Sequence, residues 1–307
     1  MGEAACASDR RMGVPSSAVL AAARERALEH GADAELVAGM GDGYTGFWAD
    51  LDCGPGPVTA FRFDMDCNEV AECAEESHRP VREGFASRWP GLMHACGHDG
   101  HAAVGLGLAE VLVSIRRHLR GRIRLIFQPA EEGARGALPM SEAGAVDGVD
   151  VLFGFHIGFK AEGPGSLICG TQGFLATTKR DVLFSGVPAH AGAAPEEGKD
   201  ALLAACSAVV NLHAISRNGK GGTRIAVGRL EGGEARNVIP ASARLFMETR
   251  GETTELDAYM TAESERILRA SADLWGCACE WRTVGNSAGG GSSPELARLI
   301  ATVAEAM

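Results

Sequence analysis

A short segment between residues 94 and 101 concentrates side chains that can bind a metal ion. It reads His-Ala-Cys-Gly-His-Asp-Gly-His, with three histidines and one cysteine in eight positions. Thiolates and imidazoles are good ligands for zinc and related divalent metals, and a Cys-x-His pair such as Cys96 and His98 can point at one ion. The segment therefore predicts a metal site. The alternative is a group of histidines that begins a helix next to a buried cysteine.

Two adjacent carboxylates form the second candidate feature. Glu131 and Glu132 follow the strand-like run Arg-Leu-Ile-Phe of residues 124–127. One carboxylate can bind a metal while its neighbour takes a proton from water, a division of labour that hydrolytic metal sites use. Standing alone, the pair would be read as a solvated acidic turn.

Three further side chains close neighbouring strand-like runs. His156 follows an apolar run that ends near residue 155, and Asp64 and Asp66 end the run Ala-Phe-Arg-Phe-Asp-Met-Asp. Sites in α/β proteins are built at the carboxyl ends of sheet strands, so these features on consecutive elements favour one site. We expect His156 to join it and the two aspartates to support it. A solvated strand end is the equal alternative for the aspartates.

The elements that must position these residues alternate between strand and helix. Apolar spacing predicts helices over residues 19–30 and 102–119, and short apolar runs predict strands over residues 58–66, 121–129 and 149–158. Strands that alternate with helices in this way indicate an α/β layer with a mainly parallel sheet.

The order of elements changes after residue 176. The patterns predict a strand, a helix, two strands, a helix and a strand within residues 177–285. This β-α-β-β-α-β order is ferredoxin-like and fits a second domain of plausible size. A glycine- and serine-rich linker and one further helix follow, which suggests that the first domain resumes near residue 287. We therefore expect domains over residues 1–176, 177–286 and, as the start of the return, 287–307.

Composition excludes several classes of protein. The chain has 307 residues, enough for two domains, and a net charge of −11, which disfavours nucleic acid and anionic membranes as partners. No apolar run is long enough to cross a bilayer, and the first residues, Met-Gly-Glu-Ala-Ala-Cys, begin no apolar signal core. The nine cysteines form no evident disulfide framework, so we expect cytosolic thiols and a cytoplasmic protein.

Five motifs, in this order, resemble those of the metal-dependent amidohydrolase, aminoacylase and carboxypeptidase family. They are MHACGHDGH, IFQPAEEG, FHIG, FSGVPAHAG and EARNVIPASA. The resemblance implies an α/β, metallopeptidase-like catalytic domain with a mainly parallel sheet, interrupted by a ferredoxin-like (βαββαβ) lid that dimerises. It also implies a divalent metal cofactor, zinc or manganese, with two ions in a complete site.

The resemblance assigns roles to individual residues. It implies that the metal ligands are Cys96, His98, Glu132 and His156. It also implies that Glu131 is the general base and that His190 of the lid reaches across the dimer to stabilise the tetrahedral intermediate. Asn237 and Arg250 are the implied substrate-binding residues, because they could hold the carboxylate of the substrate.

The implied reaction is hydrolysis of the amide bond of N-acyl amino acids. The segments SHRPVREGFAS, GFLATTKRDVLFSG and RNVIPASARLFMETRGE favour p-aminobenzoyl-glutamate as the substrate. The implied assembly is a homodimer or a heterodimer with a related B-type subunit. Two family segments, an amino-terminal helix and a carboxy-terminal return with a last His ligand, are not found, so we expect low activity and poor solubility. The alternatives are a thiol hydrolase that uses Cys96 with His98 or His101, and a non-catalytic or truncated dimerisation subunit.

Overall fold

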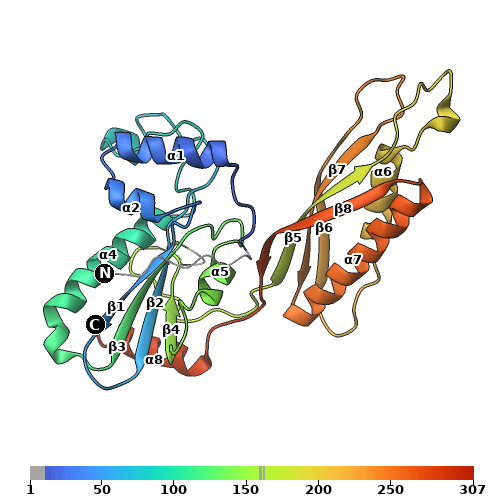
Figure 1. Ribbon diagram of the computed structural model, residues 1–307. Helices are drawn as coiled ribbons and strands as arrows, with labels where there is room; N and C mark the ends of the chain where they lie inside the picture. The colour runs from blue at the N-terminus through green and yellow to red at the C-terminus, as the bar shows by residue number, and fades with distance from the viewer. Residues whose placement is uncertain (1–10, 159–160, 162) are drawn as a thin grey trace. The chain divides into compact units, whose positions relative to one another are not determined.

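The computed structural model describes residues 11–158, 161 and 163–307, in two compact units (Figure 1). Unit 1 spans Met1–Ser166 and unit 2 spans Leu167–Met307. The first ten residues, which hold the start examined for a signal core, lie outside the described part. Within the described part, no helix is long and apolar enough to cross a membrane.

The sheet of unit 1 brings the ends of three parallel strands to one edge. Its strands are β1 (Phe47–Asp52), β2 (Val58–Asp64), β3 (Arg122–Gln128) and β4 (Val151–Gly154), in the order β1-β3-β2-β4. Strand β2 pairs in parallel with both β3 and β4, whereas β1 pairs antiparallel with β3. The prediction of a mainly parallel sheet is confirmed. Parallel pairing places the segments that follow β2, β3 and β4 at the same edge.

Helix α4 (His98–Ile115) is the element of unit 1 that adds the metal-binding motif to this edge. It begins four residues before the predicted start, after Gly97, whose φ of 78° lies in the left-handed region. His98 and His101 therefore belong to its first turn. The other helices are α1 (Ser17–Glu29), α2 (Ala34–Gly39), α3 (Arg79–Arg82), the 3-10 turn η1 (Arg116–His118) and α5 (Ala137–Glu142).

Apolar residues pack on both faces of this sheet. Alternation along the strands places Phe63 and Phe127 in a cluster with Leu112 of α4, and places Ala60 and Ile126 in a second cluster. Burial on two faces is what a parallel sheet in an α/β layer requires. This packing fixes α4 on the sheet and therefore fixes the histidines in its first turn.

Unit 2 has the predicted β-α-β-β-α-β order. Its elements are β5 (Ala176–Ser185), α6 (Ala201–His213), β6 (Thr223–Gly232), β7 (Ser242–Gly251), α7 (Thr254–Leu274) and β8 (Ala278–Ser287). The strands form an antiparallel sheet in the order β6-β7-β5-β8, and α6 and α7 contribute to one apolar core with it. The 3-10 turn η2 (Pro195–Glu197) precedes α6, and the helix α8 (Pro294–Glu305) follows β8.

Candidate metal centre

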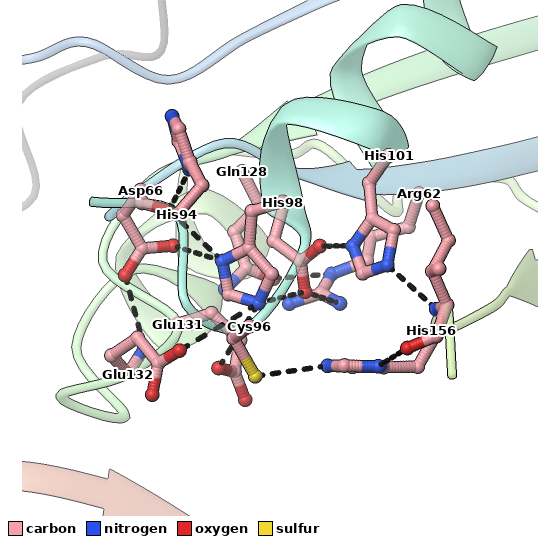
Figure 2. Close-up of polar contacts among 12 residues, drawn as sticks. Arg62, Asp66, His94, Cys96, His98, His101, Gln128, Glu131, Glu132 and His156 are labelled. Atoms are coloured by element: carbon pink, nitrogen blue, oxygen red, sulfur yellow. Dashed lines mark hydrogen bonds and ion pairs between the residues drawn. The ribbon is translucent and has the colours of Figure 1, made fainter. Parts of the chain in front are cut away.

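The carboxyl edge of the first sheet collects the candidate residues of unit 1 in one place (Figure 2). Sulfur, nitrogen and oxygen atoms from three sets of side chains each lie within 4.8 Å of one another. The sets are Cys96, His98 and His156; His98, Glu131 and Glu132; and Asp64, His98 and His101. His98 belongs to all three sets and is the centre of the cluster.

His98 is held by one ring nitrogen and presents the other to carboxylates. Its ring is 1% exposed, and its Nδ1 contacts the backbone oxygen of Asp66 at 3.1 Å and Oδ1 of the same residue at 3.2 Å. Its Nε2 has no hydrogen-bond partner among the described residues. That nitrogen lies 3.8 Å from Oε1 of Glu132 and 3.9 Å from Oε2 of Glu131. A buried nitrogen in this position is suited to binding a cation between the two groups.

Cys96 and His156 approach each other from the start of α4 and the end of β4. The Sγ atom of Cys96 lies 3.3 Å from Nε2 of His156, and Nδ1 of His156 lies 2.9 Å from the backbone oxygen of Ile157. The backbone nitrogen of Cys96 donates to the side chain of Asn68 at 3.2 Å. These contacts with Asn68 and Ile157 hold both residues at the edge of the cluster.

A tight loop after β3 presents the two glutamates. Ala130 and Ala134 have φ angles of 55° and 54°, unusual for residues with a Cβ, and they flank Glu131 and Glu132. The backbone nitrogen of Glu132 donates to Oδ2 of Asp66 at 3.0 Å, so the same aspartate fixes this loop and His98. The strained loop thus holds both carboxylates against the histidine.

The carboxylates determine the protonation of their neighbours. Burial raises the pKa of Glu131 above its ordinary value, the nearby charge of Glu132 raises it further, and Arg62 opposes the change. Burial together with Glu132 and Glu131 raises the pKa of Cys96 to about 11. Without a cation, Cys96 is therefore a neutral thiol at neutral pH. This disfavours the thiol-hydrolase alternative, which needs a thiolate nucleophile.

The donor atoms present fit a divalent metal ion. Donors about 2.1 Å from one ion in a tetrahedral arrangement lie about 3.4 Å from each other, close to the 3.3 Å between Cys96 and His156. Excess negative charge, a soft sulfur and a buried nitrogen that lacks a hydrogen bond within the described residues all favour a cation. Zinc accepts this mixture of ligands, and its imidazole and carboxylate members also suit manganese.

The interpretation of Asp64 and Asp66 as support has a structural counterpart in their contacts. Asp64 is 1% exposed and bonds to His101, and it lies 2.5 Å from a guanidinium nitrogen of Arg62. Burial would raise the pKa of Asp64, but His101 and Arg62 together hold it below its ordinary value. Asp64 is therefore an ionised, buried carboxylate, unlike a solvated strand end.

Sequence patterns did not single out three residues around the cluster. Arg62 donates to Gln128 at 2.9 Å as well as to Asp64, and Ile157 donates its backbone N–H to Nε2 of His101 at 2.8 Å. Arg62 and Gln128 lie near the ends of β2 and β3, so their position at the sheet edge was the available signal. The contact of Ile157 is made by its backbone, which carries no signal in the sequence.

The three remaining candidate residues lie in unit 2. His190 and Asn237 belong to neighbouring segments, because Ala191 donates its backbone N–H to the backbone oxygen of Asn237 at 3.0 Å. Arg250 lies on β7, where its Nε donates to Glu248 at 2.7 Å, and this bond raises the pKa of Arg250. The structure thus brings His190 close to Asn237 and gives Arg250 a carboxylate partner within its own strand.

Comparison with known proteins places the chain in a family. The model of peptidase family M20/M25/M40 matches residues 60–307. The chain belongs to this peptidase family. The α/β fold is also that of a solved M20/M25/M40 relative, the aminobenzoyl-glutamate utilization protein of Klebsiella pneumoniae, with a TM-score of 0.82. That match has 40% identity and covers 97% of this chain and 68% of the other.

Two curated relatives in this M20/M25/M40 family are 47% identical to the chain. The indole-3-acetyl-aspartic acid hydrolase of Enterobacter agglomerans aligns over 96% of this chain and 67% of its own length. One of the named subunits of the p-aminobenzoyl-glutamate hydrolase of Escherichia coli K12 aligns over 93% of this chain and 65% of its own length. The chain thus spans about two thirds of the length of these relatives.

A more distant solved structure in the family bears on the metal centre. It is a dinuclear metal binding peptidase of family M20 from Bacillus subtilis, with a TM-score of 0.58 and 26% identity. The match covers 86% of this chain and 67% of the other. A fold shared with a metal-binding peptidase agrees with the three sets of possible ligands at the edge of the first sheet.

Proposed function

We propose that this chain carries the metal centre of an amidohydrolase that cleaves the amide bond of N-acyl amino acids. The observation that carries the proposal is the convergence of one cysteine, two histidines and two glutamates at a single sheet edge. Membership of the M20/M25/M40 family supports the same reaction class. This supports the hydrolase over the alternative of a non-catalytic dimerisation subunit.

In this proposal Cys96, His98, Glu132 and His156 hold the metal, zinc or manganese, with two ions in the complete site. The bound metal would polarise the scissile carbonyl and lower the pKa of water from about 15.7 towards 7. The protein residues do the rest. Asp66 orients His98 by its ring nitrogen Nδ1 and orients Glu132 by its backbone nitrogen, so one carboxylate aligns two proposed ligands.

Glu131 is the proposed general base. Its carboxylate lies beside Nε2 of His98, and its raised pKa makes it a better proton acceptor than an ordinary glutamate. In the proposed reaction it takes a proton from the attacking water at Oε and later delivers that proton to the nitrogen of the leaving amine. The loop held by Asp66 keeps this carboxylate in reach of both steps.

The names of the two curated relatives point to a substrate class. One is an indole-3-acetyl-aspartic acid hydrolase and the other belongs to a p-aminobenzoyl-glutamate hydrolase, so both names join an aromatic acyl group to an acidic amino acid. We propose that the substrate here has the same two parts, with p-aminobenzoyl-glutamate as the compound to test. The products would be p-aminobenzoate and glutamate.

The domain organisation belongs to the same proposal. Residues 1–176 would form the first part of the catalytic domain, residues 177–286 a lid that dimerises, and residues 287–307 the start of the return. His190 would stabilise the tetrahedral intermediate from across the dimer, and Asn237 and Arg250 would bind the carboxylate of the substrate. Arg250 would then have to exchange or share its partner Glu248.

The proposed assembly is a dimer with a second copy or with a related B-type subunit. The relative from Escherichia coli supports it, because its name describes one subunit of a hydrolase. The proposed location is the cytoplasm. All eight cysteines in the described part are free, as expected for a reducing compartment.

Substitution of the proposed base tests this function. Glu131→Gln keeps the shape of the side chain but cannot accept the proton, so we expect hydrolysis of p-aminobenzoyl-glutamate to fall about 10²- to 10⁴-fold. Metal content should stay at the wild-type value, since Glu131 is not a proposed ligand. Indoleacetyl-aspartate serves as the second substrate. Full activity of the variant would refute the assignment of Glu131.

A further inference from the structure

We propose that His101 is a positioning residue that orients His156 through the backbone of Ile157. The proposal rests on the metal centre described above and concerns how one of its proposed ligands is held. His101 would bind no metal itself. It would form the middle of a relay that runs from Asp64 to Ile157 and ends at the ring of His156.

The ring of His101 is completely used by protein partners. It is 0% exposed, its Nδ1 bonds to Oδ1 of Asp64, and its Nε2 accepts the backbone N–H of Ile157 at 2.8 Å. A backbone nitrogen can only donate, so Nε2 carries no proton and Nδ1 is the protonated nitrogen that donates to Asp64. Although His101 belongs to one of the possible ligand sets, both of its nitrogens are therefore occupied.

Ile157 is held at three points. Its N–H is bound by His101, and its side chain lies against the start of α4, where only glycines leave room. A Cβ atom at Gly100 would lie 2.6 Å from Cδ1 of Ile157, and one at Gly97 would lie 3.7 Å from its Cβ. Its backbone oxygen faces Nδ1 of His156 at 2.9 Å. The residue after the proposed ligand thus has a fixed position.

The last contact selects the tautomer of His156. A carbonyl oxygen can only accept, so Nδ1 of His156 carries the proton and Nε2 keeps its lone pair. That Nε2 lies 3.3 Å from Sγ of Cys96, on the side of the proposed ligands. A hydrogen bond from the other ring nitrogen is the usual means by which proteins orient a metal-binding histidine.

The far end of the relay is anchored in the sheet. Arg62 on β2 lies 2.5 Å from Asp64 and donates to Gln128 at the end of β3 at 2.9 Å. The chain of contacts therefore joins the ends of β2 and β3, the first turn of α4 and the segment after β4, as Figure 2 shows. Small movements of His156 would have to disturb this buried network.

Two substitutions separate the two bonds of His101. The side chain of His101→Gln can place its Oε1 where Nε2 accepts from Ile157, whereas His101→Asn reaches only the position of Nδ1 beside Asp64. Affinity for Zn²⁺ is measured on the full chain by competition with a chromophoric chelator. We expect His101→Asn to weaken binding about 10- to 100-fold, and His101→Gln to retain more of the affinity than His101→Asn.

A double-mutant cycle distinguishes positioning from general destabilisation. If His101 acts through His156, then His101→Asn should cause no further loss of Zn²⁺ affinity in a His156→Ala background. Equal losses in both backgrounds would overturn the relay while leaving the metal centre intact. Failure of the wild-type chain to bind Zn²⁺ would instead refute the proposed function, so the two failures are distinguishable.

A measurement on the wild-type chain avoids the risk that a variant does not fold. Long-range ¹H–¹⁵N spectra of the metal-free protein report which ring nitrogen of each histidine is protonated. The relay predicts that His101 and His156 are both neutral and protonated at Nδ1. A proton on Nε2 of His156 would contradict it.

Discussion

Cys96 owes its chemical character to the acidic side chains around it. Glu131 and Glu132 lie close enough to raise the pKa of its thiol to about 11, and burial acts in the same direction. The same carboxylates would stabilise a cation that binds to the sulfur. One set of charges therefore disfavours a free thiolate nucleophile and favours a metal ligand.

Alkylation tests this character in the metal-free protein. A thiol pKa of about 11 in place of the ordinary 9.0 lowers the thiolate fraction about 100-fold, and the thiolate is the form that reacts. We therefore expect Cys96 to react with iodoacetamide at about pH 8 far more slowly than the exposed Cys67 and Cys73, as followed by mass spectrometry of peptides. Fastest modification at Cys96 would favour the thiol-hydrolase alternative.

At the scale of elements, helix α4 carries the metal-binding motif because it lies very close to the sheet. Gly105 is buried where a Cβ atom would lie 2.8 Å from Phe127 and 2.9 Å from Phe63. A larger residue would push the helix, and His98 with it, away from the strand ends. The close approach thus connects the packing of the core to the geometry of the site.

Two glycines of α4 form a matched pair for this claim. We expect Gly105→Ala to lower the free energy of unfolding by about 1–3 kcal/mol, because the added methyl overpacks two aromatic rings. No atom lies within 4 Å of the position that a Cβ would take at Gly107, so Gly107→Ala should raise stability by up to about 1 kcal/mol through helix propensity. Urea unfolding measures both. A stabilising Gly105→Ala would contradict the close packing.

The sequence could predict the strands and helices that have strong apolar periodicity, and the strand ends that carry charged residues. It could not predict β1 (Phe47–Asp52), an edge strand whose residues are exposed or half-exposed and include two aspartates. The start of α4 was placed too late because the polar motif hides the helical pattern of its first turn. The contacts of Ile157 depend on backbone groups, and only the folded arrangement of α4 and β4 shows them.

At the scale of the whole molecule, unit 2 has a core of its own. The buried members of this core lie between Val182 and Ala272, and the partly buried residues packed on it lie within Ile215–Trp281 and in α6. Four alanines of α6 are completely buried against the sheet, which allows that helix to lie close to it. Such a unit has what a domain needs in order to fold independently.

Expression of residues 174–290 alone tests the proposed lid as a domain. This fragment holds all four strands of the sheet, both packed helices and the bridge between Phe174 and Gly290. We expect a cooperative thermal transition by circular dichroism. A fragment with secondary structure but without a cooperative transition, and with strong binding of a hydrophobic dye, would contradict the independent core.

The central claim is that Cys96, His98, Glu132 and His156 together bind a divalent metal in this chain. Its most direct test is elemental analysis of the purified protein, wild type beside Cys96→Ala. We expect one or two zinc or manganese ions per wild-type chain and loss of metal in the variant, with both proteins folded by circular dichroism. A folded wild-type chain that binds no metal, or a variant that keeps its full metal content, would contradict the claim.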